Sequence, residues 1–149
     1  MCNTQCGSPS VYKDTMKWTL EVVVVPVSDV DRAKEFYADK VGFKVDFDMK
    51  VDADNRVVQL TPPGSGCSIA LGYGIVPAMT PGSLKGLQLV VPDVLAARAE
   101  LLERGVEVSE LTVFGKNPGP GGELDNVGFV FFSDPDGNGW AVQQISYER

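Results

Sequence analysis

The 149-residue chain contains no histidine, and this absence excludes several kinds of chemistry. A Ser-His-Asp triad needs an imidazole base, and zinc or iron centres usually take histidine or carboxylate ligands. Cysteine is scarce, and the chain has only Cys2, Cys6 and Cys67. Because the count is odd and no secretory signal is recognisable, we expect reduced thiols in a cytoplasmic protein. We interpret Cys2 and Cys6 as incidental thiols of a flexible tail.

The chain also lacks long apolar runs and an excess of positive charge. No run reaches the roughly 18 apolar residues that a transmembrane helix needs, so we expect no membrane segment. Acidic residues outnumber basic ones by 20 to 13, which gives a formal net charge of −7. Surfaces that bind nucleic acid or anionic membranes carry the opposite sign. We therefore expect neither partner, whereas the charge permits a cationic ligand.

A short pattern occurs twice along the chain. VSDVDRA at residues 27–33 is echoed by VPDVLAA at residues 91–97, and each copy follows an apolar strand, at 20–27 or at 87–91. An aspartate at the third position of each copy is placed to cap a helix. The composition, 44% apolar and 22% charged, is that of a globular protein. The sequence thus predicts two related folded halves.

Each predicted helix has a start and a stop signal. Asp29 and Asp93 begin the helices, and Gly42 and Gly105 end them. Short strands follow, at residues 43–48, 56–62 and 67–72 in the first half and at 106–113, 127–133 and 140–146 in the second. The predicted fold is α+β, with a β-α-β-β-β module repeated. The expected organisation is a flexible N-terminal tail (1–17), a first module (18–72), a linker (73–85), a second module (86–146) and a short tail (147–149).

Two glycine-rich stretches lie in the second half. Asp134–Gly139 (DPDGNG) combines proline with asparagine and glycine, which is typical of a hairpin turn. Residues 114–126 (FGKNPGPGGELDN) form a longer loop, and we interpret it either as a lid over a ligand site or as plain surface disorder. The strand after the hairpin ends in Gln143 and Gln144, two amides in an otherwise apolar setting.

The doubled module resembles the vicinal oxygen chelate superfamily, which includes glyoxalase I, extradiol dioxygenases and the bleomycin-resistance proteins. The resemblance rests on VSDVDRAKEFYADKVGF at residues 27–43 and FFSDPDGNGW at residues 131–140, and it extends over about residues 18 to 146. It implies two modules whose curved sheets enclose a cavity, usually completed within a dimer. The modules pair within one chain or across two chains, and the linker suits either arrangement.

The resemblance also implies where a divalent metal would be held. The usual ligand positions correspond to Val22, Gly86 and the strand after the hairpin, which offers Ala141 and Gln143. None of these residues supplies an imidazole or a carboxylate, the donors that transition metals prefer. We therefore expect no metal cofactor.

Strand alternation and the resemblance together predict the lining of the cavity. The predicted ligand-binding residues are Trp18, Val22, Val24, Phe47, Gln59, Gln88, Phe131, Trp140 and Gln143. The aromatic residues either stack on a ligand or belong to the core. The glutamines need a hydrogen-bond partner, which is either a ligand or neighbouring backbone. Asp46 and Asp48 alternate with Phe47 and are expected on a solvated face of their strand.

Two classes of function follow from this lining. The first is a metal-free protein like the bleomycin-resistance proteins, a cytoplasmic homodimer that sequesters an amphipathic, aromatic or cationic small molecule such as a drug or natural product. The alternative is an enzyme on the same fold, a glyoxalase-like lyase or isomerase or a relative of the dioxygenases, with Glu21 and Tyr73 as catalytic candidates. A third possibility is a stress or regulatory protein that kept the cavity without the chemistry.

Overall fold

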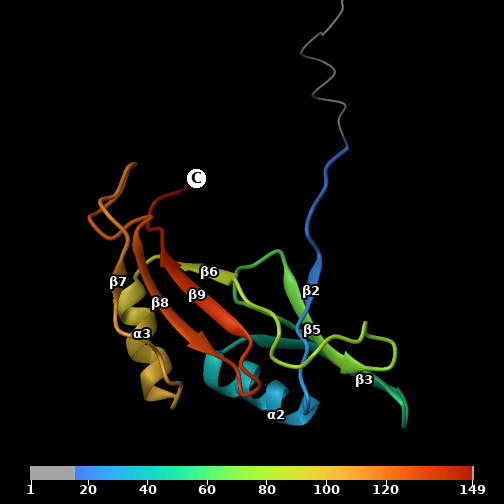
Figure 1. The fold of residues 1–149 in the computed structure, drawn as a ribbon. Coiled ribbons are helices and arrows are strands. Elements are labelled where there is room, and N and C mark those ends of the chain that lie inside the picture. The colour runs from blue at the N-terminus through green and yellow to red at the C-terminus, as the bar shows by residue number, and fades with distance from the viewer. Residues whose placement is uncertain (1–15, 149) are drawn as a thin grey trace, which may run out of the picture.

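The computed structural model describes residues 16–148, which form two four-stranded sheets with helices packed against them (Figure 1). Residues 1–15 of the expected tail, which include Cys2 and Cys6, lie outside the described residues. Within residues 16–148, no helix has the length and apolar character needed to cross a membrane.

Both sheets have the same topology, which confirms the α+β fold. The strand order is β2-β5-β4-β3 in the first sheet and β6-β9-β8-β7 in the second. In each sheet the strand that comes first in the chain pairs in parallel with the one that comes last, β2 with β5 and β6 with β9. The elements of the first are β2 (Val22–Val24), α2 (Val30–Glu35), η1 (Phe36–Val41), β3 (Lys44–Asp52), β4 (Asn55–Thr61) and β5 (Ser68–Tyr73). Those of the second are β6 (Leu87–Val91), α3 (Val94–Glu103), β7 (Thr112–Val113), β8 (Gly128–Ser133) and β9 (Gly139–Gln144).

The predicted helix starts and stops are confirmed. The side chain of Asp29 accepts a hydrogen bond from the backbone N–H of Arg32, and that of Asp93 accepts one from Ala96. At the other ends Gly42 and Gly105 have φ angles of 94° and 86°, in the left-handed region that favours glycine. Between α2 and Gly42 the chain widens into the π-helical turns of η1, which the sequence pattern does not indicate.

Two strands are much shorter than predicted. A strand was expected over residues 20–27, but β2 spans only Val22–Val24. Residues 106–113 were expected to form a strand, but only Thr112 and Val113 pair with β8. Upstream of them, the backbone N–H of Ser109 donates to the carbonyl of Phe131, and the Ser109 hydroxyl accepts from the Phe131 N–H. Single contacts of this kind hold the segment against β8 without a continuous ladder.

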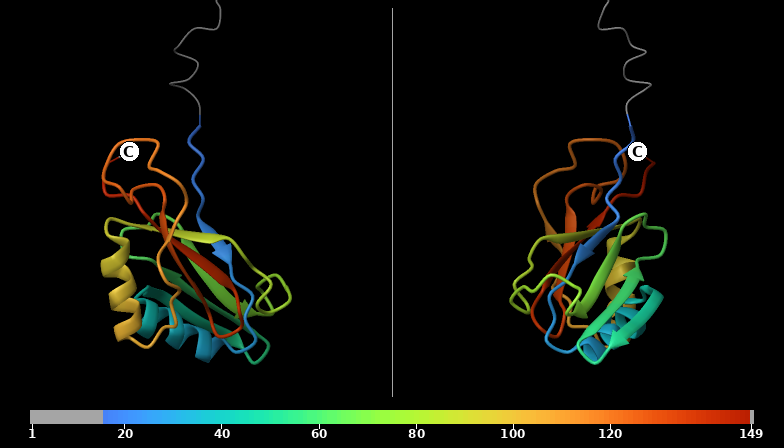
Figure 2. Two further views of the ribbon diagram at one scale, coloured as in Figure 1. Left: turned by 60° about the vertical axis from the view of Figure 1, so that its left-hand side comes forward. Right: turned by 90° about the vertical axis from the view of Figure 1, so that its right-hand side faces the viewer.

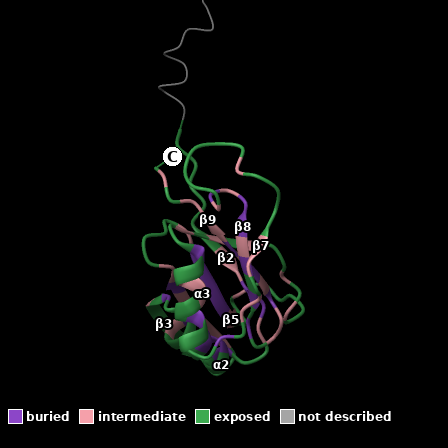
Figure 3. Ribbon diagram, turned by 90° about the vertical axis from the view of Figure 1, so that its left-hand side faces the viewer, coloured by how far each residue is buried: buried purple, intermediate pink, exposed green. Residues whose placement is uncertain are grey.

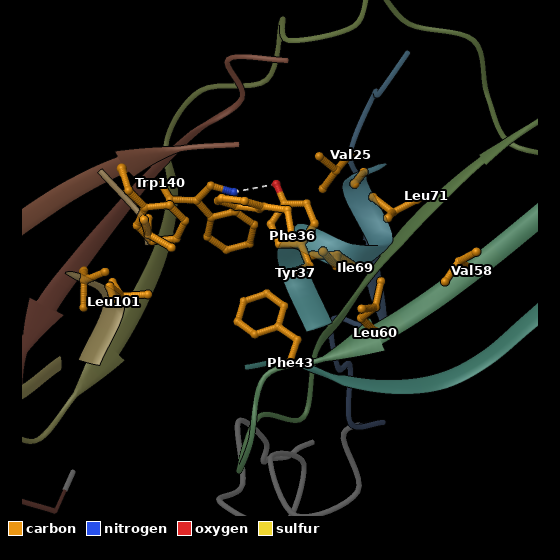
Figure 4. Close-up of a cluster of buried hydrophobic side chains, with 14 of the residues drawn as sticks. Val25, Phe36, Tyr37, Phe43, Val58, Leu60, Ile69, Leu71, Leu101 and Trp140 are labelled. Atoms are coloured by element: carbon orange, nitrogen blue, oxygen red, sulfur yellow. Dashed lines mark hydrogen bonds between the residues drawn. The ribbon is translucent and has the colours of Figure 1, made fainter. Parts of the chain in front are cut away.

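The two modules share one hydrophobic core rather than two separate ones. Tyr37 from η1 lies against Phe43 and Trp140, with ring centroids 5.7 Å apart in both pairs (Figure 4). Phe132 stacks on Trp140. Trp140 and Phe132 come from the second sheet, and Tyr37 and Phe43 come from the first module. The helix-facing side chains of both sheets therefore meet in the same cluster, and the buried residues gather there (Figure 3).

A buried polar network ties the modules together inside this core. Tyr37 Oη donates to Asp134 Oδ2 over 2.7 Å and accepts the indole N–H of Trp140 over 2.9 Å. The side-chain amide of Asn138 donates to Asp134 over 2.7 Å and to the carbonyl of Pro26 over 2.8 Å. The predicted hairpin turn thus exists, and it bonds directly to the first module.

We expect this network to make the folded protein less stable at alkaline pH. Burial and the adjacent Asp134 carboxylate raise the pKa of Tyr37 well above its ordinary value. A group whose pKa is raised on folding contributes stability that is present below its unfolded pKa, about 10 for tyrosine, and is lost as pH rises above it. The free energy of unfolding should fall more steeply above pH ~10 in the native protein than in Tyr37→Phe. Denaturant titrations at pH ~8 to ~11 check this, and equal slopes would contradict it.

The segment that leads into β2 remains outside the sheets. Residues 16–21 are exposed and belong to no strand. In each view they project beyond the ends of the sheets (Figure 2). Their apolar side chains at Met16, Trp18 and Leu20 are more than two-thirds exposed.

Candidate functional site

Each sheet has one face that packs into the shared core and one that does not, which we call its open face. In the first sheet, Val58 and Leu60 are buried in the core. Residues that alternate with them lie on the open face, where the register aligns Val24, Ala70, Gln59 and Phe47 in one row across four strands. Gln59 and Phe47 are therefore direct neighbours, whereas Val24 lies in the same row beyond Ala70, and Val22 lies on the same face. Phe47 is 42% exposed.

The open face of the second sheet carries the other predicted residues. The register aligns Gln88, Ala141 and Phe131 in one row. Gln143 lies in the adjacent row and pairs with Phe129. Both sheets turn their other faces into the same core, so the two open faces point away from it. Within one chain the structure thus presents two half-sites and brings neither against the other.

The two adjacent glutamines of β9 have different partners. Gln143 accepts a hydrogen bond from the Gln88 amide over 2.7 Å and donates to the carbonyl of Asn126 over 2.9 Å. Gln144, on the core side, accepts the backbone N–H of Val94 and so fixes the start of α3. The Gln88 side-chain oxygen accepts no hydrogen bond from residues 16–148. Of the amides on this face, Gln88 therefore presents a free acceptor.

Three phenylalanines form an aromatic strip beside the glutamines. The rings of Phe129 and Phe131 stack with centroids 6.1 Å apart and planes 7° apart, and Phe114 meets Phe129 edge-on at 5.4 Å. Phe131 and Phe114 are 37% and 58% exposed. Phe114 was not among the predicted ligand-binding residues, because it lies in a segment whose sequence is typical of a loop. Flat, exposed rings of this kind suit stacking against a planar ligand.

A depression of about 600 Å³ lies next to this strip. Its lining includes Gly86, Phe131 and Ala141, with the charged residues Lys85, Glu107 and Asp134. Gly86 leaves space here, because a Cβ at this position would meet no atom within 4 Å. The volume is in the range of small-molecule sites.

The glycine-rich loop beside the open face, which was interpreted either as a lid or as surface disorder, is ordered by hydrogen bonds. The Asn117 amide donates to the carbonyls of Pro120 and Gly122, and Asn117 Oδ1 accepts from the Asn126 side chain over 2.7 Å. Asp125 is buried, and hydrogen bonds from Ser146 hold the pKa of its carboxyl below the usual value. The loop is thus anchored by its own side chains.

The side chains of the two tryptophans lie off the open faces on which they were predicted. Trp140 is only 4% exposed, and its ring points into the core. The reason is alternation: Ala141 and Gln143 occupy the open face, so Trp140 takes the other. Trp18 is 86% exposed in the segment before β2 and contributes to neither open face of its own chain.

The two catalytic candidates also lie off these faces. Glu21 precedes Val22 and points to the opposite side by alternation, while its backbone carbonyl accepts the N–H of Ser68. Tyr73 pairs with Arg56, on the side of β4 opposite to Gln59. The structure therefore brings neither residue to the glutamine pair or to the aromatic strip.

The residues at the ligand positions that the resemblance implies do not fit a divalent metal centre. Val22, Gly86 and Ala141 carry no donor atom in their side chains, and the Gln143 oxygen is already bonded to Gln88. Within residues 16–148, no three histidine, cysteine, aspartate or glutamate side chains come close enough to hold an ion. A lone amide oxygen is a poor ligand for a transition metal.

Comparison with known proteins settles the family. The sequence profile of the Glyoxalase/Bleomycin resistance protein/Dioxygenase superfamily matches residues 19–142. The chain belongs to this superfamily. No curated protein matched the chain.

Several solved structures of the superfamily are similar to this chain. TnmS3, an antibiotic binding protein from Streptomyces sp. CB03234, is 38% identical over 87% of this chain and 98% of its own, with a TM-score of 0.66. A glyoxalase/bleomycin resistance protein from the same Streptomyces is 39% identical over 85% of this chain and 100% of its own, with a TM-score of 0.64. A member of the superfamily from Sphaerobacter thermophilus DSM 20745 is 30% identical over 88% and 100%, with a TM-score of 0.68.

Proposed function

We propose that the protein binds and sequesters an amphipathic, aromatic small molecule in the cytoplasm, without a metal and without turnover. The observation that carries this proposal is the open face of the second sheet, where the stacked Phe129 and Phe131 lie beside the Gln88–Gln143 pair. Mostly apolar sites with a few placed polar groups are typical of ligand pockets. The similarity to TnmS3, described as an antibiotic binding protein, supports a drug or natural product as the ligand.

A second copy of the chain completes the site in this proposal. The two open faces of one chain point away from a common core, so an enclosed cavity needs another surface. In a symmetric dimer, the first-sheet face of one copy would lie over the second-sheet face of the other. Exposed apolar side chains support this arrangement, namely Trp18, Leu20, Phe47, Met49, Val90 and Phe131. Exposed apolar patches are typical of interfaces.

Metal analysis combined with ligand binding tests the proposal. Purified untagged protein should contain no stoichiometric Zn, Ni, Mn or Fe, and added ions should not shift its melting temperature. Acridine, a planar aromatic probe, should bind saturably with a Kd on the order of micromolar, unchanged by EDTA, and Phe131→Ala should weaken binding about tenfold. Bound metal at one equivalent per chain, with a melting temperature raised by several degrees, would instead favour an enzyme.

A further inference from the structure

A bulge in β3 moves Asp46 onto the open face of the first sheet. Val45 pairs with Leu60 and Phe47 with Gln59, which leaves Asp46 as the extra residue between two register positions. Strict alternation would have placed Asp46 beside Asp48, on the side that faces α2. The bulge breaks the alternation, so the side chain of Asp46 reaches the same face as Phe47.

Neighbouring polar groups hold the Asp46 carboxylate through one of its two oxygens. Gln59 Nε2 donates to Asp46 Oδ2 over 3.3 Å, and the Thr61 hydroxyl donates to the same oxygen. The Thr61 proton is used in this bond, so Ser68 is the donor in the 2.6 Å contact between the two hydroxyls. Asp46 Oδ1 accepts no hydrogen bond from residues 16–148. The carboxylate is therefore oriented and still has a free oxygen.

The charge of Asp46 is not neutralised by the rest of the described chain. Among residues 16–148, no lysine or arginine forms an ion pair with it, whereas Asp48 on the opposite side is paired with Lys34 and Arg56. Those two cations hold the pKa of Asp48 well below its usual value. Asp46 has no such partner, so its charge is available to a ligand.

The residues around Asp46 and in the opposite half-site determine the net charge of the complete pocket. Phe47 follows Asp46 and is half-exposed, which places an aromatic ring next to a carboxylate. The lining of the depression on the second sheet contains one basic residue, Lys85, and two acidic residues, Glu107 and the buried Asp134. These residues do not supply an excess of positive charge, so Asp46 leaves the combined site with a net negative charge.

We propose that Asp46 selects a ligand with a positively charged nitrogen, a protonated or quaternary amine on an aromatic body. The cation would lie at Asp46 Oδ1 and against the face of Phe47, while the aromatic body stacks on the Phe129–Phe131 strip across the interface. This inference rests on the proposed ligand site. It adds that the ligand is cationic and that Asp46 is the residue that recognises its charge.

A matched pair of probes separates charge from shape. Acridine and N-methylacridinium differ by one methyl group and one positive charge, and acridine is neutral at pH ~8. Titration of the full-length protein, followed by probe fluorescence, should show that the cation binds about tenfold more tightly. Asp46→Asn should remove this preference, because it should weaken binding of the cation about tenfold more than it weakens binding of acridine. Asp54→Asn is the control, because it removes the same charge from the β3–β4 turn and should leave the preference intact.

The outcomes distinguish this inference from the proposed function. Equal binding of both probes to the native protein, or an Asp46→Asn variant that keeps the preference, would overturn the role of Asp46 and leave the ligand site standing. Loss of preference in both Asp46→Asn and Asp54→Asn would assign it to overall charge instead, which also overturns the inference. If neither probe binds saturably, the proposed function fails and the role of Asp46 fails with it. Thermal unfolding of both variants verifies that each is folded.

Discussion

Replacement of Asp134 with alanine is expected to lower the free energy of unfolding by about 4 kcal/mol and the melting temperature by roughly 10 °C. Asp134 accepts hydrogen bonds from the Tyr37 hydroxyl and from both the side chain and the backbone of Asn138, and it is only 5% exposed. Alanine would leave the Tyr37 hydroxyl and an Asn138 N–H buried without this acceptor. Buried donors without partners cost about 1–3 kcal/mol each, so the loss should exceed that of an ordinary surface substitution.

Two further variants show whether the loss of stability comes from the buried Asp134 network. Asp39→Ala removes an exposed acid from η1 and should change stability by no more than about 0.5 kcal/mol. Tyr37→Phe keeps Asp134 but removes the hydroxyl that joins it to Trp140, and should cost about 1–2 kcal/mol. Chemical denaturation followed by circular dichroism measures all three. A cost for Asp134→Ala as small as that of Asp39→Ala would show that the hairpin network does not hold the modules together.

Local signals in the sequence were sufficient for most of the fold. The repeated aspartates mark both helix starts because capping depends on neighbouring backbone alone, and Gly42 and Gly105 mark the ends for a similar reason. Alternation along β6 and β9 placed Gln88 and Gln143 on one face, and the structure shows them hydrogen-bonded to each other. These features follow from residues close in sequence or from the period of a strand.

The remaining features depend on contacts between distant segments. Alternation places Trp140 on the face of β9 opposite to Ala141 and Gln143, but the burial of its N–H depends on Tyr37, far away in the other module, which supplies the acceptor. The bulge at Asp46 cannot be read from β3 alone, because it is defined by the register with β4. Whether the modules share a core also depends on packing between them. Alternation therefore predicted which side chains share a face where the ladder is regular, and failed where an extra residue interrupts it.

A mixed dimer is expected to recover a tight site that neither parent variant has. Phe47 lies on the open face of the first sheet and Phe131 on that of the second, so Phe47→Ala and Phe131→Ala each damage a different half-site. Each homodimer should bind acridine at least about tenfold more weakly than the native protein. Suppose that each site is formed by the first sheet of one copy and the second sheet of the other. In a heterodimer of the two variants, one site then carries both substitutions and the other carries none. Co-expression with two different tags and tandem purification would yield this heterodimer.

The number of tight sites in the heterodimer then reports where the ligand site is built. Pairing across copies predicts one site of native affinity per heterodimer, because the Phe47→Ala copy supplies its intact second sheet and the Phe131→Ala copy its intact first sheet. If each site lay within one chain, every copy would carry one substitution and no native-affinity site would appear. A purely monomeric protein in size-exclusion chromatography with light scattering would also contradict the shared site. The mixed dimer thus tests directly whether the outward-facing half-sites of one chain are completed by a second copy.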